Sequence, residues 1–284
     1  VVEMTELQGV MGRYYAKLSG EPEEVAEGIF EHYLPRNAED RLPEGKPGTL
    51  VGIADRLDSI AGLFAVGLAP TGSKDPFALR RAALGLVQLL IGKALEFDLD
   101  WGLTQAGKLL PVNFSEEDKQ AAFEFITGRL RGLMLERGYR YDVVDAVLHR
   151  QAAIPAKAQG YIDTLSAWVA RPDWMLILPA YSRCVRITRD LNQKFSIQEK
   201  LFVEPAEKDL FTALLKAQRA LAGSEDLNAA LEQLEKMVPV INNFFDSVLV
   251  MAEDTAIRQN RLGLLQEIVA LLSDKVDLSA LEGF

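Results

Sequence analysis

Apolar residues recur at steps of three and four along most of the chain, which is the spacing of one face of an α-helix. One series comprises Met4, Leu7, Met11, Tyr14 and Leu18. A second comprises Leu50, Ile53, Leu57, Ile60 and Phe64. Strict alternation of apolar and polar residues, the pattern of a half-buried strand, is scarce. The chain is therefore predicted to be all-α.

The spacing, with the residues that begin and end helices, predicts a series of helical segments. They cover about 4–18, 49–64, 76–95, 116–137, 140–151, 155–170, 174–194, 206–221, 225–237, 239–252 and 254–273. Thr49 is expected to cap the helix that follows it. Asp75 and Pro76 are expected to begin another, because aspartate accepts bonds from free helix amides and proline lacks a donor that would go unpaired there. Irregular breaks are expected at 35–48, 98–115 and 195–205.

Composition indicates an ordinary globular protein, with 49% hydrophobic and 25% charged residues in 284. No uninterrupted apolar run approaches 18 residues and no charged-then-apolar leader is visible, so no membrane partner is expected. The single cysteine, Cys184, cannot form an internal disulfide, which favours a reducing, cytoplasmic location. A helical pattern already runs through Val1, so the chain is expected to be part of a longer one.

The net charge of −10 argues against a protein that coats nucleic acid indiscriminately. The charge is unevenly distributed. Residues 129–194 hold 11 Lys/Arg against 6 Asp/Glu, or +5, whereas 1–128 and 195–284 carry −8 and −7. A basic middle between acidic flanks could guide one polyanion along a defined track. A solvated helical surface with a chance excess of base explains the charge equally well.

Residues for nucleophilic or zinc chemistry are few. The only histidines, His32 and His149, are far apart in the sequence, which disfavours a nucleophile–His–acid triad. One cysteine and two histidines cannot supply a structural zinc site. Residues 71–74 (TGSK) lack the spacing of a phosphate-binding loop, and Asp75 would place negative charge where a phosphate would sit. Helix capping is the better interpretation of Asp75, and no catalytic residue is predicted.

The run Ala54-Asp55-Arg56-Leu57 resembles the closing segment of HD-superfamily phosphohydrolases, in which an Asp in a similar setting is the last metal ligand. The chain contains no His-Asp dipeptide to complete such a site, and one or two donors hold a divalent ion poorly. We therefore predict no metal site and treat Asp55 as a vestigial candidate. The alternative is that Asp55 pairs with Arg56 or with a neighbouring helix, or accepts buried hydrogen bonds.

Arg183, Arg186 and Arg189 recur every third residue of a predicted helix, and Lys194 continues this basic ridge. The planar fork of arginine binds two phosphate oxygens at once. Because Asp190 is the only acid nearby in the sequence, an RNA contact is favoured over pairing with acids. The remaining basic candidates for RNA contacts are Arg137, Arg140, Arg80, Arg81, Arg258 and Arg261.

Four collinear segments together resemble one family. They are TELQGVMGRYYA (5–16), EHYLPRNAEDRLP (31–43), VGIADRLDSIAGLFAVGLAPTGSKDPFALRRAALG (51–85) and INNFFDSVLVMAEDTAIRQNRLGLLQ (241–266). The family is that of the bacterial glycyl-tRNA synthetase β subunits, and the resemblance is to its C-terminal portion. One departure is that Arg186 stands where the family usually has asparagine.

The resemblance implies a degenerate HD-like helical domain over 1–97, a helical linker or body over 98–180, and a DALR-type anticodon-binding bundle over 181–284. It implies tRNA-Gly and the α subunit as partners, with no DNA. It also implies that the α subunit carries the aminoacylation site and uses ATP and Mg, so that no cofactor is expected in this segment. The chain is therefore expected to be the tRNA-binding part of a glycine–tRNA ligase. The alternatives are a metal-dependent phosphohydrolase using Asp55 and a scaffold that holds the α subunit.

Overall fold

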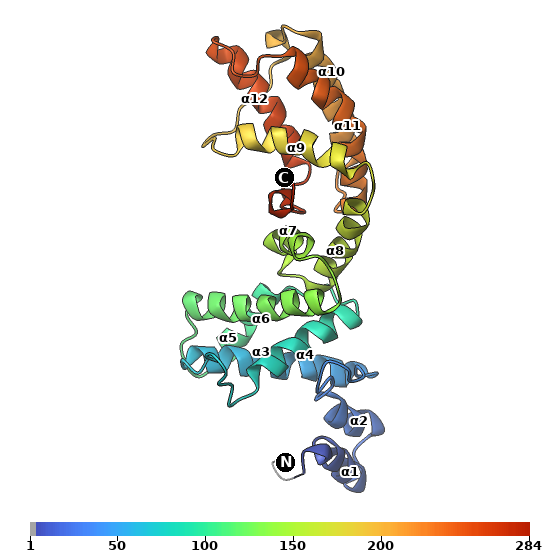
Figure 1. Cartoon of the computed structure of the whole chain (residues 1–284). Coiled ribbons are helices and arrows are strands. Elements are labelled where there is room, and N and C mark those ends of the chain that lie inside the picture. Colours follow the sequence, from blue (N-terminus) through green and yellow to red (C-terminus); the bar gives the residue numbers. More distant parts are fainter. Residues whose placement is uncertain (1–3) are drawn as a thin grey trace. The chain divides into compact units, whose positions relative to one another are not determined.

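The computed structural model describes residues 4–284, so the helical pattern expected through Val1 lies outside the described residues. Over that range the chain forms twelve α-helices, three short 3-10 helices and no strand, which confirms the all-α prediction (Figure 1). The α-helices are α1 (Val10–Leu18), α2 (Glu23–Glu31), α3 (Lys46–Ala65), α4 (Leu79–Gly92), α5 (Leu99–Leu109), α6 (Glu116–Glu136), α7 (Tyr141–Gln151), α8 (Pro155–Val169), α9 (Trp174–Thr188), α10 (Pro205–Ala220), α11 (Leu227–Ser247) and α12 (Thr255–Ala270). The 3-10 helices are η1 (Thr5–Leu7), η2 (Glu199–Leu201) and η3 (Leu278–Ala280).

The chain divides into two compact units. Unit 1 consists of the residues up to 138 together with 152–159, and unit 2 of residues 139–151 and 160–284. The chain therefore passes between the units at 138/139, at 151/152 and, within α8, at 159/160. The predicted division into 1–97, 98–180 and 181–284 concerns domains of a different extent and stays a prediction. Among the described residues, no helix has both the length and the apolar character needed to cross a bilayer.

Helix α3 is the centre of unit 1 and packs against α2, α4, α5 and α6. Its predicted apolar face is buried at Ile53, Leu57, Ile60 and Phe64, because these side chains meet the surrounding helices. Leu50 is the exception, with 66% of its surface exposed.

A buried arginine joins α3 to the segment that follows α2. The guanidinium of Arg56 donates to the carbonyls of five residues, at distances between 2.8 and 3.3 Å. The five are Gly52, His32, Tyr33, Leu34 and Pro35. Burial lowers the pKa of Arg56 from its usual value. Gly52 and Gly85 leave the space for this side chain, since a Cβ at either would lie within 3.0 Å of a guanidinium nitrogen.

Unit 2 is built from α9 to α12, with α7 and η3 packed together beside them. Helix α10 packs on α11, and α12 packs on α9. The fully buried side chains of these helices include Leu210, Leu214, Leu231, Leu234, Phe244, Leu265 and Ile268. The C-terminal segment is tied to α7, because the amide of Asp277 donates to the Ala146 carbonyl at 2.8 Å and the amide of Glu282 donates to buried Asp142 at 3.0 Å.

The prediction of an irregular break over 98–115 was wrong, because this segment contains α5. Asp98 caps the helix by accepting a bond from the Trp101 amide at 2.9 Å. Leu99 and Leu103 are then buried within unit 1. The glycines at 102 and 107, which weaken a helix in isolation, allow close approach here, since a Cβ at either position would overlap the side chain of Phe97 or Phe114.

The two helices predicted over 225–237 and 239–252 are one helix, α11, with Pro239 inside it. A proline inside a helix removes a backbone bond and costs about 3 kcal/mol or more. The buried face of α11 runs on either side of Pro239, through Leu234, Met237, Ile241 and Phe244, and Pro239 itself is exposed. Burial of that continuous face offsets the lost bond.

Three predicted helix starts also differ from the structure. The first predicted helix is interrupted at Gly9, whose φ of 78° separates η1 from α1. Helix α3 begins at Lys46, so Thr49 lies inside its first turn and donates to the Gly45 carbonyl at 2.9 Å. Helix α4 begins at Leu79 and not at Pro76, with Ala78 at the N-cap position, although the Asp75 carboxylate does accept the first two amides of the helix.

Candidate nucleic-acid interface

Helix α9 and the residues after it carry the α9 basic surface, which we define as Arg183, Arg186, Arg189 and Lys194. The helix forms because Trp174, Ile177, Leu178 and Tyr181 occupy one buried face that packs on α11 and α12. The four basic residues lie outside this buried face, on α9 and on the segment that follows it. Arg186, Arg189 and Lys194 are exposed and Arg183 is half-buried.

Arg183 is held against α11. Its guanidinium carbon lies 4.2 Å from the centre of the Phe245 ring, a cation–π contact. The same group lies 3.7 Å from a carboxylate oxygen of Asp246 and 3.5 Å from the Asn242 side-chain oxygen. No local pattern indicates these partners, because they are about 60 residues away along the chain.

The other members of the α9 basic surface also have partners. Arg189 lies 3.7 Å from Asp190, and Lys194 lies 2.7 Å from Glu267 of α12. Arg186 donates to the Phe284 carbonyl. Exposed ion pairs of this kind contribute little, typically 1 kcal/mol or less, so they break readily in favour of a stronger anion. The expectation that few acids face this ridge was incomplete, since it considered only acids nearby in the sequence.

Arg137 and Arg140 belong to different units. Arg137, at the end of α6, donates to the Gln159 side chain at 2.7 Å. Arg140, just before α7, pairs with buried Asp142 through bonds of 2.6 and 3.1 Å. Burial by itself would raise the pKa of Asp142, but bonds from the Glu282 amide and from Arg140 hold that pKa below its usual value. Arg140 therefore has a structural role in unit 2 whether or not it contacts RNA.

Arg80 and Arg81 are adjacent on α4 but differ in their surroundings. Arg80 donates to the Gly72 carbonyl and is half-buried, so it helps to close the loop before α4. Arg81 is exposed and has no ion-pair or hydrogen-bond partner among residues 4–284. Asp75 accepts the amides of Leu79 and Arg80 at 2.8 and 2.9 Å, which confirms that it caps α4 and fills the place that a phosphate would need.

The structure removes Arg261 from the accessible candidates. Its side chain is 6% exposed, and it pairs with fully buried Glu207 at 2.9 Å. An RNA contact would have to break this pair and leave Glu207 buried without its cation. Arg258, one turn earlier on α12, is half-buried and donates to the Ala252 carbonyl at 3.1 Å and to Thr255 at 3.3 Å.

Asp55 lies on the exposed side of α3 and neither accepts a hydrogen bond nor forms an ion pair with another described residue. Its expected pairing with a neighbouring helix was therefore wrong, and Arg56 is directed to backbone carbonyls instead. Across residues 4–284, no three His, Cys, Asp or Glu side chains come together as metal ligands. The phosphohydrolase alternative thus has no ligand set within the described part of the chain.

The remaining reactive groups are placed for structure. His149 lies 3.3 Å from Asp277, a contact between α7 and the C-terminal segment. Cys184 is fully buried in α9, and burial raises the pKa of its thiol to about 12. A thiol with such a pKa is unreactive at neutral pH.

Two family models match the chain. Residues 1–149 match the model described as glycyl-tRNA synthetase beta subunit. Residues 177–280 match the model described as DALR anticodon binding domain. The second match contains most of α9 and all of α10 to α12, and therefore the whole α9 basic surface.

Curated proteins similar to the chain have one name in common. The chain is 42% identical to the "Glycine--tRNA ligase beta subunit" of Myxococcus xanthus (strain DK1622) over 99% of its own length and 42% of that protein's length. It is 40% identical to the protein of that name from Moorella thermoacetica, and 37% identical to that from Clostridioides difficile (strain 630). The chain thus spans about two fifths of the length of these relatives, 41–42%.

Proposed function

We propose a function in tRNA binding from one premise: the chain belongs to the glycyl-tRNA synthetase β-subunit family. The relatives are named as subunits of a glycine–tRNA ligase, and we extend that activity to the protein of which this chain is a part. In this proposal an α subunit supplies the aminoacylation site together with ATP and Mg, and this chain binds tRNA-Gly. A cytoplasmic location belongs to the same proposal.

The observation that carries the proposal is the position of the α9 basic surface. It lies within the part of the chain that matches an anticodon-binding domain, and three of its four cations are exposed. The present partners of these three cations are the exposed carboxylate of Asp190, the half-buried carboxylate of Glu267 and the backbone oxygen of Phe284. A phosphate can displace such partners, because exposed ion pairs contribute little and the planar fork of arginine binds two phosphate oxygens at once.

The remaining predicted RNA contacts differ in whether the side chain is available to bind a phosphate. Arg81 is exposed and without an ion-pair partner within the described residues, so it could bind a phosphate at no cost to the fold. Arg80, Arg137, Arg140 and Arg258 each support backbone or side-chain bonds inside their own unit. We retain them as secondary candidates. Arg261 is not included, because it is buried in an ion pair.

The test is a titration of tRNA-Gly against the chain at several salt concentrations. We expect the variant Arg186→Ala/Arg189→Ala/Lys194→Ala to weaken binding at least tenfold and to flatten its dependence on salt. Each lost phosphate contact lowers the slope of log K against log salt by roughly 0.7–0.9, so three lost contacts lower it by roughly 2.1–2.7.

The matched control is Lys208→Ala/Lys216→Ala/Arg219→Ala, which removes three exposed cations from α10 of the same unit. This variant has the same net charge as the first, so a purely non-specific attraction would weaken equally in both. If the two variants lose affinity and slope to the same extent, or if the α9 variant loses neither, the α9 basic surface does not bind tRNA.

A further inference from the structure

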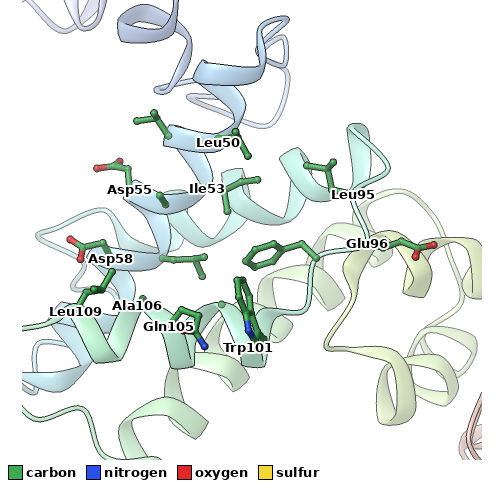
Figure 2. Close-up of a pocket in the computed structure, with 15 residues that line it drawn as sticks. Leu50, Ile53, Asp55, Asp58, Leu95, Glu96, Trp101, Gln105, Ala106 and Leu109 are labelled. Carbon is green, nitrogen blue, oxygen red and sulfur yellow. The ribbon is translucent and has the colours of Figure 1, made fainter.

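An apolar groove lies in unit 1 between α3 and α5, apart from the α9 basic surface. Its volume is about 780 Å³, and its walls are one side of each helix with the turn at Leu95–Phe97 closing one end (Figure 2). Trp101 of α5 is directed into the middle of it, beside the Phe97 ring, with 5.8 Å between the ring centres. The sequence did not indicate this groove, because α5 forms one of its walls and no helix was predicted there.

Large apolar side chains along the groove are unusually exposed. The exposed fractions are 83% for Leu109, 66% for Leu50, 57% for Trp101 and 51% for Val51. Single exposed apolar residues are ordinary on a protein surface, whereas a contiguous set around a groove marks a binding site. A central exposed tryptophan is also the residue type that most often anchors a protein interface.

The charge at the groove is of one sign. Asp55, Asp58 and Glu96 are the only charged residues among those that line it. None of the three forms an ion pair or a hydrogen bond with another described residue. Asp55 and Asp58 lie together on α3, while Glu96 lies on the opposite side of Trp101 (Figure 2). The apolar centre is therefore flanked by carboxylates without a cation.

We propose that this groove binds an amphipathic helix of a protein partner, with apolar side chains placed against Trp101 and Leu109 and Lys or Arg side chains beside Asp55, Asp58 and Glu96. Seating an apolar helix face between two helices is a common mode of peptide recognition. The flanking acids select a basic helix and repel a nucleic-acid backbone. Helix α5 has 11 residues and is about 16 Å long, which matches roughly three turns of a partner helix.

This binding site does not depend on the proposed tRNA function, because it uses no residue of the α9 basic surface. The probe is a synthetic peptide of about four helical turns, with leucine on one face and lysine on the other. A second peptide carries glutamate in place of every lysine. Trp101 reports binding, because Trp168 and Trp174 are only 4% and 7% exposed and their emission is already that of buried indole.

We expect the leucine–lysine peptide to shift the tryptophan emission to shorter wavelength in a saturable way, and the leucine–glutamate peptide to bind at least tenfold more weakly. Leu50→Ser/Leu109→Ser should weaken the lysine peptide at least tenfold, and both side chains are exposed enough to be replaced without disturbing the core. Asp55→Asn/Asp58→Asn should weaken it severalfold. The control Glu39→Gln/Glu136→Gln removes two exposed carboxylates of unit 1 outside the groove and should leave the affinity unchanged.

Four results would overturn the proposal. Equal affinity of the two peptides would show that the flanking acids do not select a basic helix. Equal affinity of the control and the groove variants for the lysine peptide would show attraction to the acidic protein as a whole. Absence of binding by the wild-type chain would show that the groove does not accept such a helix. Self-association that disappears in Leu50→Ser/Leu109→Ser would assign the groove to a second copy of the chain.

Discussion

Arg261 of α12 and Glu207 of α10 form a buried ion pair, with 2.9 Å between Nε and Oε1. Glu207 also accepts the amides of Val203 and Glu204, at 2.8 and 2.7 Å, just before α10 begins. Arg261 in turn donates to the Leu249 carbonyl at 2.8 Å. The pair therefore joins the start of α10, the segment after α11 and the middle of α12.

Replacing Arg261 should destabilise unit 2 strongly. Removing one partner of a buried pair leaves an uncompensated charge and costs about 3–5 kcal/mol. We expect Arg261→Ala to lower the free energy of unfolding by about that amount, measured by urea denaturation followed by circular dichroism. Arg258→Ala is the matched control on the same helix, with an expected cost of about 1 kcal/mol, because Arg258 bonds to groups that are local and partly exposed. Similar losses in the two variants would contradict the structural role of Arg261.

Lowering the pH should remove the stability that ionised Glu207 contributes to the fold. Burial alone would raise the pKa of Glu207, but bonds from Arg261 and from the Glu204 and Val203 amides outweigh it and hold the pKa below its usual value of 4.5. A carboxyl with a lowered pKa stabilises the fold fully above its unfolded pKa, and this contribution is lost as pH falls through the folded pKa. Thermal unfolding of wild type and Glu207→Gln should therefore differ most near neutral pH, and the difference should shrink below about pH 4.5. A difference that is constant with pH would rule out this titration.

Two substitutions at the Arg56 site in unit 1 should destabilise the fold. One replaces Arg56 with lysine, and the other adds a methyl group at Gly52. Lysine cannot reach five carbonyls, and each buried acceptor left without a donor costs about 1–3 kcal/mol. We expect Arg56→Lys to lower unfolding stability by several kcal/mol, measured by chemical denaturation. Gly52→Ala should cost about 1–3 kcal/mol by overpacking, since its Cβ would lie 2.9 Å from the Arg56 guanidinium. Gly128→Ala is the control, because a Cβ there meets nothing within 4 Å.

The single thiol should report unfolding of unit 2. Cys184 is fully buried, and burial raises its pKa to about 12, so both access and ionisation oppose reaction. At pH 8, a thiol reagent should label the native chain at least a hundredfold more slowly than the chain in guanidinium. Fast labelling of the native chain would show that α9 opens locally. Arg261→Ala should accelerate labelling, whereas Arg56→Lys in unit 1 should change it less.

Most elements could be predicted from the sequence because each helix buries a face whose spacing is visible locally. The stripes that contain Ile53 and Leu57, or Leu265 and Ile268, needed no knowledge of the partner helix. Helix α5 could not be predicted in this way. Its glycines weaken the local preference for helix, and only packing against Phe97 and Phe114 explains why they stand there.

The same distinction between local pattern and tertiary contact applies to the candidate nucleic-acid interface. The periodic arginines of α9 were visible in the sequence, and so was the capping role of Asp75. The partners of Arg183 and Lys194 were not, because Asp246 and Glu267 come from helices far along the chain. For the same reason, Arg258 and Arg261 could not be distinguished, although they are one turn apart and only Arg261 is buried with an acid.

The sequence by itself determined that the chain is helical, where most helices lie and which family it resembles, because periodicity and local motifs are properties of short segments. The tertiary structure decided which charges are available. In the folded chain Arg56 and Arg261 are buried, Asp55 and Arg81 lie at the surface, and a groove lies between α3 and α5. The physical reason is that the free energy of a charge depends on the groups around it in space, and those groups come from helices whose order along the chain does not reveal their contacts.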